Sequence, residues 1–526
     1  MLDLQTTTTM ETIAPLETIA PMETTTTMET IAPRPQPCAA GRATTNPAAP
    51  AARLSRRLVF LLAAACGLAV ANLYYAQPLL ALIARTFRAG TGAAGLIVIL
   101  TQVGYAGGLA FLVPLGDVLE RRRLVVGGLA LAAVALLAAA LAPSILVLAA
   151  LGLAIGGTSV VVQILIPFAA DLAGEAERGR VIGTIMSGLL IGILLARTVS
   201  GLVAGATSWR VMYALAAVLM VGLAAVLARA LPRSSPTVAL SYPALLRSVL
   251  ALLRDEAVLR RRALYGALGF AAFSAFWTIA AFLLAGPPYH YGATVIGLFG
   301  LLGAAGALVA ALAGRLADRG YAHGATGGFA AAILVAFGLL VLGGHALVPF
   351  IAGVLLLDLG VQGLQIINQS EIYRLGGGAR SRITTAYMTS YFVGGAAGSA
   401  GAVALYGLAG WGGVCLLGAV CAAAILALWA LIGDRGSTAT GREGNKQLRL
   451  QALGVSRSEH GVGAGRLRRL RAQTWVEQPH AVDPAAVARE EPRHERADGG
   501  QSVQPIGQRP RWPRHGRMGA RLDRHG

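Results

Sequence analysis

Long apolar runs separated by short polar turns form the main pattern of this chain. Between Gly104 and Leu124, one apolar run ends in Asp117, Glu120 and three consecutive arginines, and a second apolar run begins at once. A bilayer's hydrocarbon core is crossed by about 20 apolar residues, and arginine is favoured in cytoplasmic turns. The pattern therefore predicts a polytopic membrane protein.

Twelve apolar runs follow one another along the chain. They cover roughly residues 58–83, 92–115, 124–142, 145–170, 181–206, 210–231, 263–286, 293–317, 325–342, 347–372, 382–408 and 411–433. The connection at 232–262 is long, polar and basic, so we interpret it as a cytoplasmic linker between two six-helix bundles, at 53–231 and 263–435. The predicted fold is an all-α membrane protein with twelve transmembrane helices.

Uncommon polar and aromatic residues recur at a nearly constant offset in the two predicted bundles. Asp117 and Asp318 are 201 residues apart, and the pairs Gln163/Gln365, Arg178/Arg380, Arg180/Arg382 and Trp209/Trp411 are each 202 apart. Chance matches among the abundant Ala, Gly and Leu do not explain this register. It indicates a duplication, and hence two pseudo-symmetric halves.

Composition and charge fit this interpretation. Hydrophobic residues make up 55% of the 526 residues and charged residues 13%, with a mean hydropathy of +0.63. The formal net charge of +19 lies largely in the tails and the central linker, where a membrane surface explains it better than a nucleic acid does. The four cysteines show neither a disulfide framework nor metal-ligand spacing. We expect no cofactor, no metal and no nucleic-acid partner.

The basic residues also predict orientation. Arginines gather in alternate connections, whereas the opposite side has only Arg85, Arg88 and Arg210. This bias predicts that both termini and the linker are cytoplasmic. The low-complexity segment 1–52 and the Arg-rich segment 436–526 are expected to be disordered tails, although an RNA-binding role for the second tail is conceivable.

The charged turn after the second span resembles a motif of the major facilitator superfamily, roughly G-x-L-x-D-R-x-G-R-R. Leu115, Asp117, Arg121 and Arg122 match this motif, whereas Val113, Val118 and Glu120 depart from it; Gly314, Leu316, Asp318 and Arg319 match in the second copy. The resemblance covers about residues 55–435. It implies alternating access, a bacterial inner membrane and a cytoplasmic gate. The gate residues would be Asp117, Arg121, Arg122, Asp318 and Arg319, and charges that only set topology are the alternative.

Polar residues inside the spans mark a candidate substrate cavity, because they are costly in hydrocarbon unless they face protein or water. These residues are Asn72, Tyr75, Gln77, Gln102, Gln163, Arg197, Trp277, Asp358, Gln362 and Gln365. Asp358, Gln362, Gln365 and Gln369 follow a helical spacing that forms one stripe, which we interpret as a water-facing wall. Hydrogen bonding between helices is the alternative for this stripe and is the favoured interpretation of the isolated Gln102, and core packing is the alternative for Trp277.

Arg197 and Asp358 are the candidates for proton coupling. Each is the deepest residue of its charge within the spans, and we expect both to face the central cavity and to interact. Burial favours a neutral carboxyl and a nearby guanidinium favours a charged one, so Asp358 is suited to proton exchange. A static ion pair is the alternative.

Arg197 also bears on the solute. It stands where proton-coupled exporters of the family carry the proline of G-P-x-x-G-G, so that signature is absent as written. A buried arginine suits an anionic or polyhydroxylated solute better than a cationic drug.

These features predict a secondary active transporter of a small organic solute, with proton-coupled efflux. A uniporter, a solute–proton importer and a non-transporting receptor or scaffold are the alternatives. We expect a monomer in the lipid bilayer whose partners are a small-molecule solute and protons. An enzyme and an ATP-driven pump are disfavoured, since no catalytic constellation or nucleotide-binding loop is found.

Overall fold

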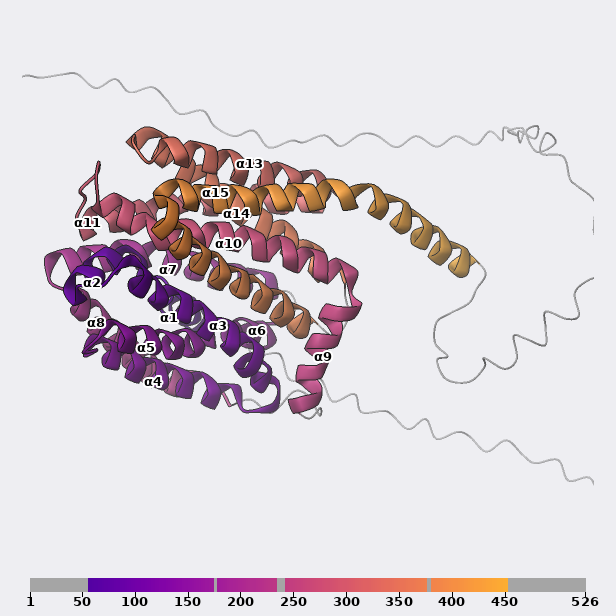
Figure 1. Cartoon of the computed structure of the whole chain (residues 1–526). Coiled ribbons are helices and arrows are strands. Elements are labelled where there is room, and N and C mark those ends of the chain that lie inside the picture. The colour runs from indigo at the N-terminus through magenta and orange to yellow at the C-terminus, as the bar shows by residue number, and fades with distance from the viewer. Residues whose placement is uncertain (1–54, 175–176, 234–241, 376–379, 453–526) are drawn as a thin grey trace, which may run out of the picture. The chain divides into compact units, whose positions relative to one another are not determined.

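The computed structural model describes residues 55–174, 177–233, 242–375 and 380–452 (Figure 1). The predictions for residues 1–52 and for 453–526 lie outside this part of the chain. Contacts divide the chain into two units at Thr440, and the apolar helices belong to the unit that ends there.

The first half of this unit consists of helices that run from Arg56 to Ala230. They are α1 (Arg56–Ala71), the 3-10 turn η1 (Gln77–Leu79), α2 (Leu80–Phe87), α3 (Thr91–Val118), α4 (Arg121–Ala140), α5 (Ile145–Ser159), α6 (Val161–Leu172), α7 (Arg178–Ala206) and α8 (Trp209–Ala230).

The second half follows a short helix in the linker, α9 (Tyr242–Asp255). It comprises α10 (Ala257–Ala285), α11 (Ala293–Leu298), the 3-10 turn η2 (Phe299–Gly303), α12 (Ala304–Asp318), α13 (Ala322–Leu342), α14 (Leu347–Tyr373) and α15 (Arg380–Ala452). In Figure 1 the helices of both halves run side by side.

Nine helices among the described residues are long and apolar enough to cross a membrane, with α5 and α6 counted as one. Their outward side chains are apolar: Leu131, Val348 and Leu408 are 58%, 79% and 83% exposed, as expected for a surface that faces lipid. The chain is therefore an all-α, multi-pass membrane protein. The count of twelve crossings stays a prediction.

The other predicted spans differ from single continuous helices in specific ways. Span 58–83 is broken between α1 and α2, where Pro78 lies at the start of η1 and removes a backbone donor. Span 293–317 is broken by η2. The last two predicted spans both lie within α15, which has a non-helical residue at Gly410 (φ 61°, ψ −149°), a conformation that suits glycine.

The boundaries of the linker and of the last helix also differ from the prediction. Helix α10 begins at Ala257, inside the segment predicted as linker, because its arginines are good helix formers. Tyr242 of α9 donates a hydrogen bond to the carbonyl of Phe111 at 2.8 Å, so the linker helix contacts α3. Helix α15 continues to Ala452, beyond the predicted boundary at 435.

Both halves pack one pair of helices through small residues. A Cβ on Gly192 of α7 would lie 2.3 Å from the carbonyl oxygen of Gly67 on α1. In the second half, a Cβ on Gly398 of α15 would lie 2.2 Å from the carbonyl oxygen of Ala271 on α10. Backbones this close require residues without bulk, and the same arrangement in each half fits a pseudo-symmetric fold.

Candidate functional site

A buried arginine lies at the centre of the polar residues inside the bundle. The Arg197 side chain, on α7, is only 2% exposed, and its Nε donates a 2.7 Å hydrogen bond to Oε1 of Gln77 on η1. Its guanidinium carbon lies 3.9 Å from the ring centre of Trp277, 4.9 Å from that of Tyr74 and 5.6 Å from that of Phe273. Arg197 is therefore held by one amide and three aromatic rings, from α10 and from the break between α1 and α2.

Asp358 on α14 is the acidic neighbour of this arginine. Its side chain is 3% exposed, and the two groups interact electrostatically. In the described structure they do not form a salt bridge within 4.0 Å, and Arg197 Nη2 has no hydrogen-bond partner. The charges are thus close and buried, yet only loosely matched, which is costly for a static pair.

The 3-10 turn η2 allows Arg197 of the first half to approach Asp358 of the second half. A Cβ on Gly300 would lie 2.6 Å from the Cβ of Arg197, and a Cβ on Gly303 would lie 3.7 Å from Oδ2 of Asp358. Larger residues at Gly300 would push α7 away. The break at η2, between α11 and α12, therefore helps to position the Arg197 and Asp358 side chains.

The two halves contact each other at the end of the bundle where α2 meets α3, here called the distal end. Thr198 on α7 donates a 3.2 Å hydrogen bond to the carbonyl of Gly297 on α11, and a Cβ on Gly205 would lie 2.0 Å from Oγ1 of Thr294. Arg85 on α2 donates to the carbonyl of Ala285 on α10 at 3.3 Å. Close packing at this end separates Arg197 from the distal surface.

A shallow surface cavity also lies at the distal end. Its volume is about 370 Å³, and its lining includes Arg85, Arg88 and Phe282. None of the predicted cavity residues lines it, so it is separate from the buried Arg197.

Four other predicted cavity residues are also well buried or paired. Asn72 Nδ2 lies 3.5 Å from Sδ of Met220, and the Tyr75 carbonyl accepts a 2.7 Å hydrogen bond from Ser200. Gln102 Nε2 donates to Ser399 at 3.2 Å, and Gln163 Nε2 donates to the Tyr105 hydroxyl at 3.4 Å. Gln102 thus joins α3 to α15 across the two halves through a hydrogen bond between helices, the interpretation favoured for it from the sequence.

The stripe on α14 divides between two surroundings. Asp358 lies next to Arg197, whereas Gln365 accepts a 2.7 Å hydrogen bond from the Tyr387 hydroxyl of α15. Gln369 lies 4.0 Å from Sδ of Met388, and Gln362 makes no side-chain hydrogen bond in the described structure. The part of the stripe formed by Gln365 and Gln369 therefore contacts helix α15.

The predicted gate residues of the first half form a network at the opposite, or proximal, end, where α3 meets α4. Arg121 pairs with Asp171 of α6 at 2.6 Å and with Asp117 of α3 at 3.5 Å, and it donates to the carbonyl of Gly116 at 3.0 Å. Arg122 donates to the carbonyl of Ala228 on α8. Arg121 therefore ties the ends of α3, α4 and α6 together.

The predicted gate residues of the second half are placed differently. Asp318 and Arg319 are exposed, and neither makes a side-chain hydrogen bond or salt bridge in the described part of the chain. Their role in a gate stays a prediction.

Several residues of these clusters lay outside the sequence prediction. Tyr74 and Phe273 contact Arg197, and Asp171 pairs with Arg121. Tyr74 is adjacent to the predicted Tyr75, and Asp171 ends an apolar run as Asp117 does. Phe273 gave no signal, because an aromatic residue in an apolar helix resembles ordinary core.

The sequence matches the profile of the Major Facilitator Superfamily over residues 59–399, which is more than half of the chain. The chain belongs to this superfamily. It is 51% identical over 378 residues to the transporter YgaY of Escherichia coli O157:H7, and the matched region covers 72% of this chain and 95% of the relative. It is 35% identical over 410 residues to the transporter SCO4007 of Streptomyces coelicolor, with 76% of this chain and 91% of the relative covered.

Solved structures of this superfamily share the fold. The nucleoside transporter NupG superposes with a TM-score of 0.58 at 13% identity, covering 71% of this chain and 99% of NupG. This chain is thus a membrane transporter of the Major Facilitator Superfamily. Its relatives YgaY and SCO4007 are also named as transporters.

Proposed function

We propose that this transporter couples the movement of a small organic solute to protons by alternating access, and that Asp358 and Arg197 are the coupled pair. The observation that carries the proposal is the buried, loosely matched pair of charges where η1, α7, α10 and α14 meet. A buried charge is costly unless it is compensated. A proton on Asp358 or a solute beside Arg197 therefore changes the stability of the whole cluster.

Efflux, the direction predicted from the sequence, is proposed to occur by exchange. Exchange requires that a proton and the solute exclude each other. A neutral solute that donates hydrogen bonds to both oxygens of the Asp358 carboxylate meets this condition, because protonation turns one of these acceptors into a donor and removes the charge that strengthens the other. An inward proton gradient would then drive such a solute out.

The free Nη2 of Arg197 favours a second candidate, a solute–proton importer. An anionic group would bind this guanidinium best when Asp358 is protonated, since the carboxylate then ceases to compete. Proton and anion would bind together, and the gradient would carry both inward. The charge of the solute thus decides the direction.

We further propose that the protein is a monomer in the bacterial inner membrane with both termini in the cytoplasm. The arginine distribution supports the orientation of the termini, and the bacterial relatives support the inner membrane.

The decisive experiment uses the full chain in vesicles with an imposed pH gradient and a panel of labelled neutral, anionic and cationic solutes. For the transported solute, we expect Asp358→Asn to abolish the response of flux to the pH gradient. Asparagine is neutral like the protonated carboxyl, so exchange of labelled for unlabelled solute without a gradient should persist for a cotransported anion and should be lost for a solute that exchanges with protons.

Asp255→Asn is the matched control, since Asp255 is exposed on the linker helix and should leave the gradient response unchanged. Gradient-driven flux that survives Asp358→Asn would reject the proposed coupling. The sign of the flux relative to the gradient separates exchange from cotransport.

A further inference from the structure

The Arg121 network provides a reference for the corresponding corner of the second half. Arg121 is the first residue of α4, and it binds the last turn of α3 through the Gly116 carbonyl and the end of α6 through Asp171. One buried guanidinium thus fixes three helix ends, because each contact is a charge-assisted hydrogen bond.

The second half lacks the residue that would repeat this contact. At the offset of 201 that relates Asp117 to Asp318, the counterpart of Gly116 is Ala317 and the counterpart of Arg121 is Ala322, the first residue of α13. The alanine side chain has no hydrogen-bond donor. The duplicated turn therefore does not supply its own clamp.

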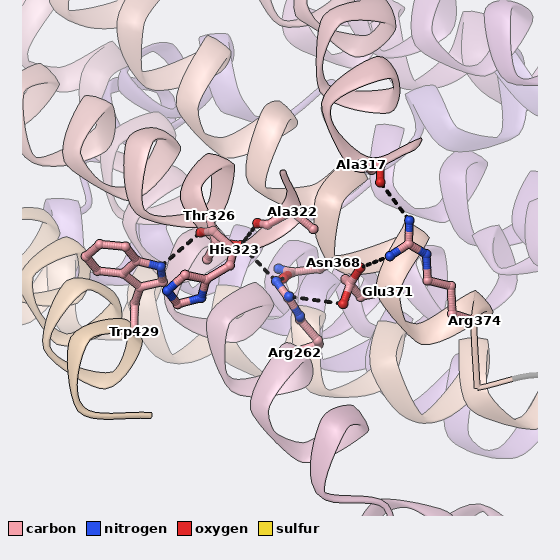
Figure 2. Close-up of polar contacts among 9 residues, drawn as sticks. All are labelled: Arg262, Ala317, Ala322, His323, Thr326, Asn368, Glu371, Arg374 and Trp429. Carbon is pink, nitrogen blue, oxygen red and sulfur yellow. Dashed lines mark hydrogen bonds and ion pairs between the residues drawn. The ribbon is translucent and has the colours of Figure 1, made fainter. Parts of the chain in front are cut away.

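Figure 2 shows that arginines from other helices bind at this corner. Arg374, just after α14, donates a 2.6 Å hydrogen bond to the carbonyl of Ala317, the counterpart of the Gly116 carbonyl that Arg121 binds in the first half. Arg374 also pairs with Glu371 at 2.9 Å. The last turn of α12 is thereby joined to the end of α14.

Arg262 of α10 extends the network to two more helices. Its side chain is 5% exposed and pairs with Glu371 at 3.3 Å, donates to Oγ1 of Thr326 on α13 at 2.8 Å, and donates to Oδ1 of Asn368 on α14 at 3.4 Å. Glu371 therefore receives one arginine from each side, as Figure 2 shows. Four helices of the second half meet in these contacts.

We propose that Arg262, Glu371 and Arg374, here called the second clamp, take the place of the missing arginine of the duplicated turn. The second clamp holds the proximal ends of α10, α12, α13 and α14 together, so that the second half moves as one body during transport. Arg374 is a positioning residue in this scheme: it acts on the α12–α13 turn through the Ala317 carbonyl.

This assignment gives the Asp318–Arg319 turn a specific place. The turn lies directly after the clamped carbonyl, and both of its charged side chains remain exposed. The second clamp fixes where the turn begins and leaves its charges available at the surface.

The test measures amide hydrogen exchange of the full chain in lipid nanodiscs. Arg374→Ala should speed exchange of the amides at 318–326 about tenfold, the value of one charge-assisted hydrogen bond, and should leave the amides at 118–124 unchanged. Arg374→Lys should recover most of the protection, because lysine still donates to a carbonyl. Arg315→Ala is the matched control, because Arg315 is an exposed arginine on the last turn of α12, next to the Ala317 carbonyl. This variant should leave the exchange of the amides at 318–326 unchanged.

A second measurement separates the clamp from general loss of packing. Glu371→Gln should also raise the exchange rate of the amides at 318–326. In the double variant with Arg374→Ala, the total increase should be smaller than the product of the two single increases, because both substitutions break one network. Multiplicative effects, or exchange that rises equally at 118–124, would overturn the proposal. So would protection at 318–326 that is unaffected by Arg374→Ala.

Discussion

At the scale of single residues, the surroundings of Arg197 explain how a cation can be stable inside the bundle. Three aromatic rings lie within 6 Å of its guanidinium carbon, and Trp277 is the nearest of them. Such contacts are attractive because the face of an aromatic ring carries partial negative charge. The rings thus supply part of the compensation that Asp358 alone, lacking a close salt bridge, does not.

Trp277 is therefore expected to matter for stability as an aromatic ring. Trp277→Leu should lower the free energy of unfolding by about 2–4 kcal/mol, through lost cation–π contact and a cavity. Trp277→Phe should cost less, because a ring remains over the guanidinium. Thermal unfolding in detergent measures both, and an equal loss in the two variants would contradict a cation–π role.

Residue-level prediction from the sequence was limited by what a one-dimensional pattern contains. The spacing of Arg197 and Asp358 gave their depth, but the rotation of each helix about its axis decides which neighbours they meet. Arg262 illustrates the difficulty: it was placed in the linker among other arginines, yet α10 begins earlier and turns it toward Glu371. Nothing in a basic run marks the member that is buried.

At the scale of helices, hydropathy predicted most elements, and proline and glycine explain several of their breaks. The run at 58–83 is one apolar segment in sequence, but Pro78 and the turn before it divide it beside Gln77, which accepts the hydrogen bond from Arg197. The break at η2 carries no proline, and its glycines only permit it. The first interruption was signalled in the sequence, whereas the second was not.

The helix pairs that pack through glycine can be tested on one helix. Gly398→Ala should lower the free energy of unfolding by about 1–3 kcal/mol, because its Cβ would overlap the backbone of α10. Gly407→Ala on the same helix, where nothing lies within 4 Å, should be neutral or gain up to about 1 kcal/mol from helix propensity. The comparison is made by thermal unfolding, and equal values would show that the contact is not tight.

At the scale of the whole molecule, contacts between the halves at the distal end bear on alternating access. Gly205 of α7 and Thr294 of α11 come from different halves, and a Cβ on Gly205 would lie 3.3 Å from the Cβ of Thr294. Cysteines at these two positions are near the separation that a disulfide requires. If the halves separate here during transport, a covalent link between them must stop the cycle.

The double variant Gly205→Cys/Thr294→Cys is expected to lose transport on oxidation, by at least about tenfold, and to regain it on reduction, because the link holds the distal end shut. Among the described residues the native Cys66, Cys415 and Cys421 are buried, so they should not interfere, and Cys38, which lies outside the described residues, is replaced by serine in every variant. Each single cysteine variant, oxidised and reduced, serves as a control for the side chain alone. Full transport by protein whose disulfide is verified by mass spectrometry would mean that the distal end stays closed throughout the cycle, and the solute would then need another route past Arg197.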